Sequence, residues 1–557
     1  MEDSRQSEST TPIVKSSDNY AYHAYSPNVD SDPDLAPNSN QTVFEHFFCR
    51  LAAHRNRAIR YATTELAGSS VSLLSSNVKG RDAYKDVVNG WAQELLGNAW
   101  VVCRTDSKDP CPTLHEFADT STNHLPPLPS PEILKQILNT ILFLHITSSK
   151  SYSAHTRAFL VAFGFESLDE NLIVEALKNP ESSVKKEEDK DEEQKKEKDE
   201  AQKQTEEATT SHALKGRTMR MVGMGLGAIA GGVLIGVTGG LAAPLVGAGV
   251  STVLGVIGVG GTSVGLIASG LASSSVVCGT LFGVYGAKSM AGMIERHTRE
   301  VRDLAIVRVG EERENETLAA RLCVSGWLES DADVTEPWRV VADGDDTFAL
   351  QWEKEALKEL SNALMMLLTS SAMKYIRVEV LRRTVFSTLM MSLAPLALLK
   401  FGQIIDNPWM NCRARAIKAG AVLGELLSKR VLGHRPVSLS GYSLGSLVIF
   451  EAIKYLSQLP PKETAHLIEN VYLFGSPIPV DDAAWTRIRR VVAGRVVNGY
   501  CSADYVLGVL CRVTSGGWKV AGLEKVEVEG VENILCEQID GHTRWRVEVG
   551  ACLQQMT

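Results

Sequence analysis

A serine between two glycines is the feature of this sequence with the clearest chemical potential. Residues 441–445 read Gly-Tyr-Ser-Leu-Gly, after the short apolar and β-branched run 437–440 and before an apolar run at helical spacing. This strand–turn–helix context is typical of a nucleophile elbow, a sharp turn that holds a serine hydroxyl at the carboxyl edge of a sheet. The positions flanking the serine must be small, and Gly441 and Gly445 meet that need. We therefore predict that Ser443 is a nucleophile.

A serine hydroxyl is a poor nucleophile unless a histidine takes its proton and a carboxylate orients that histidine. In the chain order that accompanies this elbow, the acid follows the serine and the histidine comes last. Asp504 follows the predicted strand 494–500, and His542 follows the last predicted strand, 531–536. Loops after parallel strands gather at one edge of the sheet. We therefore predict His542 as general base and acid, and Asp504 as the residue that orients it.

Other residues could take these two roles. Asp481 and Asp482 follow a predicted strand that ends at Phe474, and they remain alternatives for the acid. Asp540 is too close in sequence to the histidine to be a first choice. The remaining nearby histidines, His434 and His466, both precede the expected position, and we expect surface roles for them.

Acyl transfer places negative charge on a substrate oxygen, which backbone N–H groups can stabilise. The first donor should be Leu444, directly after the nucleophile and at the start of a helix. The second should come from the loop that follows an early predicted strand, 321–325. Gly326 permits close backbone approach in that loop. The sequence thus predicts an oxyanion hole made by Leu444 with Gly326 and Trp327.

These residues require a sheet whose strands alternate with helices. Strand candidates are 321–325, 437–440, 470–474, 494–500 and 531–536, and helical stretches are 353–374, 376–400, 411–432, 445–457 and 483–490. Such alternation favours a mostly parallel sheet covered on both faces. We predict an α/β fold, a doubly wound, α/β-hydrolase-like domain over residues 301–557.

Three regions without evident chemistry precede this domain. Residues 1–40 are rich in Ser, Asp, Asn and Pro and are predicted to be disordered. Residues 41–180 show apolar residues at helical spacing, as in Val43, Phe44, Phe47 and Leu51, and predict a helical packing domain. Residues 181–214 are dominated by charge and predict a solvated linker, and only weakly a coiled coil.

The segment 215–300 has a different character. The 67 residues between Arg220 and Lys288 contain no charge and 19 glycines, many of them four residues apart. Their number exceeds the roughly 20 apolar residues that one membrane span requires, and small residues at this spacing let helices pack closely in lipid. Basic residues flank both ends, which places both in the cytoplasm and implies an even number of spans. A buried glycine-rich layer in a soluble protein is the alternative.

Composition excludes several classes of protein. The net charge of −9 argues against nucleic-acid binding, and ten cysteines without paired spacing argue against a disulfide scaffold or a zinc site. The polar, acidic amino terminus lacks the apolar core of a signal peptide. No glycine-rich phosphate loop follows a strand, so we expect no nucleotide cofactor. The predicted reaction of a serine with a histidine and an acid needs no metal.

Several strings resemble one known family. They are Ile404–Trp409, Arg435–Gly445, Asn470–Pro477, Gly494–Tyr500, Ala503–Gly508, Trp352–Glu353 and Gly541–His542. Together they resemble the transmembrane and coiled-coil domain-containing family, the fourth of that name, over about residues 215–545. The resemblance implies multi-pass membrane proteins with a carboxyl-terminal α/β-hydrolase-like domain and trafficking proteins as possible partners. One departure is Ser446, where the family usually has alanine.

We therefore expect a serine hydrolase anchored in an intracellular membrane, with the hydrolase domain facing the cytoplasm. The adjacent bilayer suggests a lipid or another acyl ester as substrate. Two rivals remain: a catalytically inactive protein of the same fold that acts as a trafficking or adaptor scaffold, and a membrane-remodelling or pore-like role for the glycine-rich hairpin.

Overall fold

A computed structural model describes residues 39–64, 74–103, 110–164, 168–178, 274–282, 301–311, 316–369, 408–515 and 519–556. The predictions for residues 1–38, the charged linker and the helical stretch 376–400 lie outside these residues, as does almost all of the predicted membrane segment. Of that segment the structure describes only α9 (Ser274–Phe282). Within the described residues, no helix is both long enough and apolar enough to span a bilayer.

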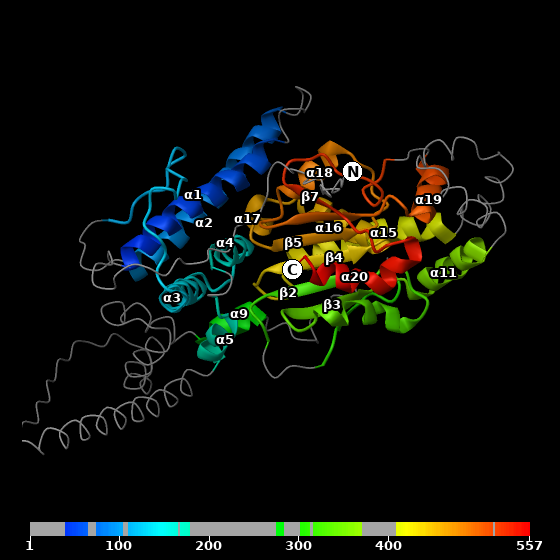
Figure 1. Cartoon of the computed structure of the whole chain (residues 1–557), viewed down its shortest axis with the longest axis horizontal. Helices are drawn as coiled ribbons and strands as arrows, with labels where there is room; N and C mark the ends of the chain where they lie inside the picture. Colours follow the sequence, from blue (N-terminus) through cyan, green and yellow to red (C-terminus); the bar gives the residue numbers. More distant parts are fainter. Residues whose placement is uncertain are drawn as a thin grey trace, which may run out of the picture. The chain divides into compact units, whose positions relative to one another are not determined.

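A seven-stranded sheet forms the carboxyl-terminal part of the described chain (Figure 1). Its strands are β1 (Ala305–Arg308), β2 (Ala320–Val324), β3 (Asp346–Gln351), β4 (Val437–Tyr442), β5 (Ile468–Phe474), β6 (Val496–Tyr500) and β7 (Val531–Leu535). Their order across the sheet is β1-β3-β2-β4-β5-β6-β7, and all neighbours are parallel except β1 and β3. The prediction of a mostly parallel α/β sheet is confirmed.

Side-chain alternation along β4 shows that helices cover both faces of the sheet. Gly441 faces α16 (Leu444–Leu456), since a Cβ there would lie 2.7 Å from Ile449. Its neighbour Tyr442 points to the other face, where its ring lies 5.9 Å from that of Trp338 in the 3-10 helix η5 (Glu336–Val341). That second face also carries α20 (Trp545–Gln554). The strand that ends in the Gly-x-Ser-x-Gly motif is therefore fully enclosed.

The other helices of this part lie between or beside the strands. They are α11 (Lys354–Thr369), α15 (Pro408–Ser428), α17 (Pro461–Thr464), α18 (Asp482–Arg489) and α19 (Tyr505–Ser515), with the 3-10 helices η4 (Asp331–Val334) and η6 (His542–Arg544). All five predicted strands are observed, with ends that differ by at most two residues. The strands β1 and β3 and the helices α19 and α20 had not been predicted.

The amino-terminal described region is helical, as predicted. It contains α1 (Ser39–Thr64), α2 (Leu74–Cys103), α3 (Pro131–Ser149), α4 (Ala154–Gly164) and α5 (Glu170–Lys178). These helices enclose a second hydrophobic core, which includes the predicted Phe47 and Leu51. The described part of the glycine-rich segment, α9, joins the same core through Val277 and Leu281, both fully buried.

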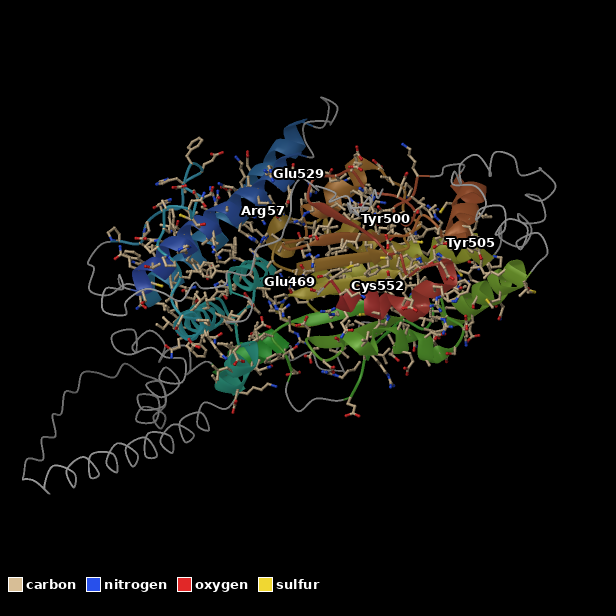
Figure 2. The ribbon with its side chains drawn as sticks, viewed as in Figure 1. Arg57, Glu469, Tyr500, Tyr505, Glu529 and Cys552 are labelled. Atoms are coloured by element: carbon tan, nitrogen blue, oxygen red, sulfur yellow. The ribbon has the colours of Figure 1, made fainter. Side chains whose placement is uncertain are left out.

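Figure 2 gives the side chains and labels residues near the two ends of the parallel strands. Glu469 lies at the amino end of β5, and Tyr505 begins α19, just beyond the carboxyl end of β6. The carboxyl ends are where the sequence analysis placed its candidate residues. For the amino ends the sequence analysis expected only surface roles, those of His434 and His466.

Candidate active site

Ser443 occupies the turn between β4 and α16 in a strained conformation. Its φ of 54° and ψ of −128° lie in a region that residues with a side chain rarely adopt. Its backbone N–H donates to the carbonyl of Phe474 at 2.9 Å, which ties the turn to the end of β5. A Cβ on Gly445 would lie 2.0 Å from the carbonyl oxygen of Val324, so only glycine fits there. The local structure is that of the predicted elbow.

Ser446 strengthens this turn. Its hydroxyl donates to the carbonyl of Gly441 at 2.7 Å and accepts from the N–H of Phe474 at 3.2 Å. The Ser446 hydroxyl, at a position where the family usually has alanine, thus connects β4, α16 and β5. It does not displace the Ser443 side chain.

Ser443, His542 and Asp504 form one hydrogen-bonded row. Ser443 Oγ lies 2.7 Å from His542 Nε2, and His542 Nδ1 lies 2.7 Å from Asp504 Oδ2. All three residues are at most 2% exposed. An ionised carboxylate only accepts hydrogen bonds, so it selects the tautomer with the proton on Nδ1. His542 then presents the Nε2 lone pair to the serine hydroxyl.

Two further donors fix the Asp504 carboxylate. The N–H of Leu507 donates to Oδ1 at 3.0 Å, which makes Asp504 the amino-terminal cap of α19. The indole N–H of Trp545 donates to Oδ2 at 3.2 Å. Trp545 reaches this place over Gly475, which has a φ of +52° and where a Cβ would lie 2.4 Å from Trp545 Nε1. The sequence analysis did not identify Trp545, because nothing in its spacing distinguishes it among nine tryptophans.

The alternative acids have other positions. Asp481 caps α18 by accepting the N–H of Ala483 at 3.0 Å, and Asp482 lies exposed in the first turn of that helix. Asp540 is exposed and lies 3.7 Å from Arg544. The carboxylate that contacts the imidazole of His542 is therefore that of Asp504.

The two alternative histidines differ from each other. His434 is exposed, in line with the surface role expected for it. His466 does not fit that expectation, because it is half-buried and its Nδ1 lies 2.9 Å from Ser153 Oγ. Both histidines precede strands, at the opposite edge of the sheet from Ser443.

The loop after β2 lies directly against the elbow. A Cβ on Gly326 would lie 2.3 Å from the backbone nitrogens of both Leu444 and Gly445. Leu444 is the first residue of α16, so its N–H has no acceptor within the helix. The structure thus brings Gly326, Trp327 and Leu444 together beside Ser443. It also places the ring of Trp327 edge-on to His542, with centroids 6.3 Å apart.

Three aromatic residues hold this loop in place. Tyr442 donates its hydroxyl to the carbonyl of Trp327 at 2.7 Å, and burial raises its pKa, which keeps it a donor. Trp338 donates to Ser325 Oγ at 3.0 Å, and Trp352 donates to the Ser325 carbonyl at 3.1 Å. Tyr442 and Trp352 both lie in strings that carry the family resemblance, but neither had been assigned this role, and Trp338 had not been noted.

The described residues offer no metal site: no group of three or more His, Cys, Asp or Glu side chains is arranged to hold an ion. The arrangement around Ser443 contains a hydroxyl, an imidazole, a carboxylate and backbone N–H groups at a helix start. These are the components of acyl transfer through a covalent intermediate.

The fold is that of an α/β protein with a mostly parallel sheet, and Ser443, His542 and Asp504 lie hydrogen-bonded to one another at the carboxyl edge of that sheet. A family model described as "Protein of unknown function (DUF726)" matches residues 216–557, and the chain belongs to this family. No solved structure matches the chain significantly.

Three curated relatives show how the family is named. An uncharacterized membrane protein of Schizosaccharomyces pombe, C6F6.13c, is 34% identical over 60% of this chain and 58% of its own length. The transmembrane and coiled-coil domain-containing protein STS1 of Oryza sativa is 34% identical over 58% of this chain and 50% of its own. The probable lipase MIL1 of Saccharomyces cerevisiae is 37% identical over 54% of this chain and 27% of its own. The chain thus spans about half the length of these relatives, or less.

Proposed function

We propose that this protein is a membrane-associated serine hydrolase of the α/β-hydrolase type that cleaves lipid or other acyl esters. The observation that carries the proposal is the buried row from Ser443 through His542 to Asp504, with both contacts at 2.7 Å. A tight strand–helix turn could occur in any doubly wound fold. A strained serine, a histidine and a buried carboxylate in this order have a specific use in nucleophilic catalysis.

The reaction would proceed through an acyl-enzyme. Ser443 Oγ attacks the ester carbonyl while His542 Nε2 takes its proton, and Asp504 stabilises the resulting imidazolium. The N–H of Leu444 and one from Gly326 or Trp327 bind the negative oxygen of the tetrahedral intermediate. His542 then returns the proton to the leaving alcohol. Water activated by the same histidine releases the acid and restores Ser443.

Two observations support the proposed substrate class: the names of the curated relatives and the uncharged segment that precedes the hydrolase-like part. The relatives from Schizosaccharomyces pombe and rice carry membrane or transmembrane in their names, and the yeast relative is called a probable lipase. The uncharged residues 221–287 precede the hydrolase-like part directly. A site held next to a bilayer meets esterified lipids at high local concentration, so we propose lipid or acyl esters.

Labelling with a fluorophosphonate tests the nucleophile. The full chain in detergent should react with the probe, and Ser443→Ala should not. Ser457→Ala is a matched control, because that buried serine lies just past the far end of α16 and its hydroxyl donates to the helix carbonyl of Lys454 at 2.6 Å. A folded wild-type protein that stays unlabelled would contradict the proposal and favour the inactive scaffold.

A comparison of esters tests the substrate class. We expect turnover of long-chain glycerolipids in mixed micelles to exceed that of a short water-soluble ester. Equal or better turnover of the short ester would remove the lipid from the proposal. Extraction of cell membranes with alkaline carbonate tests the anchor: release of the chain into the soluble fraction would remove both the bilayer argument and the membrane-remodelling rival.

A further inference from the structure

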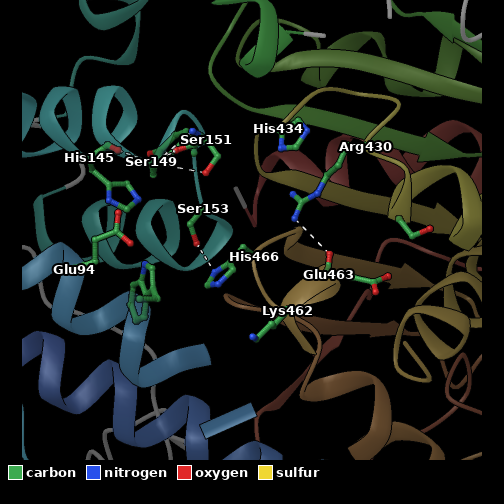
Figure 3. Close-up of a pocket in the computed structure, with 13 residues that line it drawn as sticks. Glu94, His145, Ser149, Ser151, Ser153, Arg430, His434, Lys462, Glu463 and His466 are labelled. Carbon is green, nitrogen blue, oxygen red and sulfur yellow. Dashed lines mark hydrogen bonds between the residues drawn. The ribbon is translucent and has the colours of Figure 1, made fainter. Parts of the chain in front are cut away.

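A polar cavity of about 470 Å³ lies at the amino ends of the parallel strands (Figure 3). His434 lines it just before β4, and His466 lines it just before β5. The loop between α3 and α4 closes the opposite side. This loop is joined to both strands, because the N–H of Tyr152 donates to the carbonyl of His434 at 2.9 Å and that of Ala154 donates to the carbonyl of His466 at 3.0 Å.

The cavity contains a guanidinium without a counter-charge. Arg430 lines it, and the hydrogen bond found for its side chain is a long one, 3.4 Å, to the backbone carbonyl of Glu463. Within the part of the chain that the structure describes, no carboxylate pairs with Arg430. The Glu463 carboxylate extends away from it (Figure 3). Burial lowers the pKa of Arg430 to about 10, so its charge is poorly compensated.

The other lining groups include several donors as well as the carboxylates of Glu94 and Glu463. Lys462 lies on the same side as Arg430, and Ser149, Ser151 and Ser153 lie across from them (Figure 3). Burial first, and Arg430 second, lower the pKa values of His434 and His466, which favours the neutral form of each ring, and a neutral imidazole can donate one N–H.

Two strained residues adjoin the cavity. Arg430 and Lys150 both have a φ of 55°, a left-handed conformation that is costly for residues with a side chain. Lys150 is the left-handed carboxyl-terminal cap of α3, and Arg430 lies just past the end of α15, where its N–H donates to the carbonyl of Leu427 at 2.9 Å. The two helix ends thus fix the backbone on both sides of the cavity.

We propose that this cavity is a binding site for a phosphate ester, with Arg430 and Lys462 as its cationic ligands. Guanidinium and ammonium groups are the side chains that recognise phosphate oxygens, and serine hydroxyls complete the coordination. The volume falls in the range of small-molecule sites, so it admits a headgroup or sugar attached to the phosphate. The phosphate ester could be a phospholipid headgroup or a soluble metabolite.

The site is separate from the candidate active site. The six residues of β4 lie between His434 and Ser443, a distance of about 20 Å. Binding here therefore requires neither a working nucleophile nor the reaction proposed above. Its test can use Ser443→Ala throughout, which prevents hydrolysis of an esterified probe.

Thermal unfolding of the full-length Ser443→Ala protein in detergent tests the proposal. The probes are inorganic phosphate, glycerol 3-phosphate, dioctanoyl phosphatidate and, as a control without phosphate, dioctanoylglycerol. We expect saturable stabilisation by the phosphate-bearing probes alone. Arg430→Gln should weaken binding by tenfold or more, since a lost charge-assisted bond has roughly that effect.

Further variants keep the test decisive. Lys462→Gln changes an exposed side chain and should also weaken binding without affecting the fold. Arg339→Gln changes a residue whose side chain is 65% exposed and lies outside the cavity, and this variant should bind the probes as the parent does.

The relative affinities of the probes identify the ligand. Much tighter binding of phosphatidate than of glycerol 3-phosphate would identify a lipid headgroup, and similar affinities would identify a soluble ester. The proposal would be overturned if no probe bound saturably, or if the Arg430→Gln and Lys462→Gln proteins both bound the probes as tightly as the parent protein does.

Discussion

Asp504 has two structural roles at once. One carboxylate oxygen caps α19 through Leu507, and the other accepts from His542 and Trp545. The conformation of the side chain is thus determined by a helix start as well as by the histidine. This double use explains how a carboxylate that is completely buried can stay ordered, since all its contacts are donors.

The substitution Asp504→Asn separates the two roles. Asparagine caps helices about as well as aspartate, so we expect α19 and the fold to persist. An amide can donate to Nδ1 and so favour the wrong tautomer of His542, and turnover should fall by roughly 10⁴-fold. Ester hydrolysis and circular dichroism of the full chain measure the two effects. Near-normal turnover would show that His542 does not need the Asp504 carboxylate, and would contradict the orienting role.

Trp545→Phe tests the second donor to the same carboxylate. Phenylalanine keeps a ring against Phe474, whose centroid lies 5.9 Å from that of Trp545, but removes the indole N–H. We expect the rate of fluorophosphonate labelling to fall by roughly tenfold, because the carboxylate loses a hydrogen bond that positions it. An unchanged rate would show that His542 and Leu507 position Asp504 without Trp545.

At the scale of elements, the site depends on close backbone contact between the loop after β2 and the start of α16. The loop after β2 reaches the start of α16 so closely that Gly326 and Gly445 leave no room for a side chain. The backbone N–H groups proposed to bind the oxyanion therefore belong to the same packed unit as the strained Ser443. This unit consists of β2, β4 and α16. A larger residue in place of Gly326 or Gly445 should displace Ser443 as well as lower the stability of the fold.

Glycine substitutions measure this packing. Gly441→Val should lower the free energy of unfolding by a few kcal/mol, because its Cβ would lie 2.7 Å from Ile449 and 2.9 Å from the backbone of Gly445. Gly326→Ala should have a similar effect and also slow labelling of Ser443. Gly344→Ala is the control, since nothing lies within 4 Å of its Cβ position. Equal melting temperatures for all three variants would refute the tight elbow.

Much of this arrangement could be predicted because it follows local order in the chain. Buried parallel strands are short apolar runs, and the candidate residues lie in the turn or loop that follows each strand: Ser443 directly after β4, Asp504 four residues after β6 and His542 seven residues after β7. The strand β3, Asp-Thr-Phe-Ala-Leu-Gln, was missed because polar residues at both of its ends hide its apolar centre. Trp545 and the aromatic supports of the Ser325 loop act across long sequence separations. No local pattern encodes such contacts.

At the scale of the whole described chain, one arginine connects the helical region with the sheet. Arg157 of α4 bonds Glu170 at 2.9 Å, Asp345 at 2.9 Å and Glu469 at 2.7 Å. Burial alone would lower the pKa of Arg157, but these carboxylates outweigh it and raise the pKa well above its ordinary value. Burial also raises the pKa of Glu469. The cluster is stable only while all partners are present.

Arg157→Met should therefore destabilise the protein by about 3–5 kcal/mol, because it leaves buried carboxylates without a counter-charge. Urea unfolding of the full chain measures the change. Lys135→Met is the matched control: the Lys135–Asp169 pair, with side chains 46% and 35% exposed, should contribute no more than about 1 kcal/mol. Similar midpoints for the two variants would show that Arg157 does not hold the regions together.

Buried histidines predict acid sensitivity. Burial lowers the pKa of His145 from 6.5 to about 4. Above 6.5 the ring is neutral in the folded and unfolded chains and adds no pH dependence. Below 6.5 the unfolded chain binds a proton that the folded chain cannot, so stability falls until the pH reaches about 4. The free energy of unfolding should fall by about 2 kcal/mol between neutral pH and about pH 5 because of this histidine. Urea unfolding of the His145→Gln protein over the same pH range should not show this contribution.

The position of Arg157 has a consequence for the evolution of this family. The family model begins at residue 216, so it includes Asp345 and Glu469 but omits the helix that neutralises them. Asp345 also lies 3.7 Å from Arg321 inside the shared domain, whereas Arg157 is the one cation that pairs with Glu469 among the described residues. A homologue with a different amino-terminal region should supply a cation to Glu469 from another segment or have a neutral residue in its place. Co-variation between this acidic position and sequence outside the shared domain should therefore be visible across the family, and it would reveal which upstream segments are bound to the hydrolase-like core.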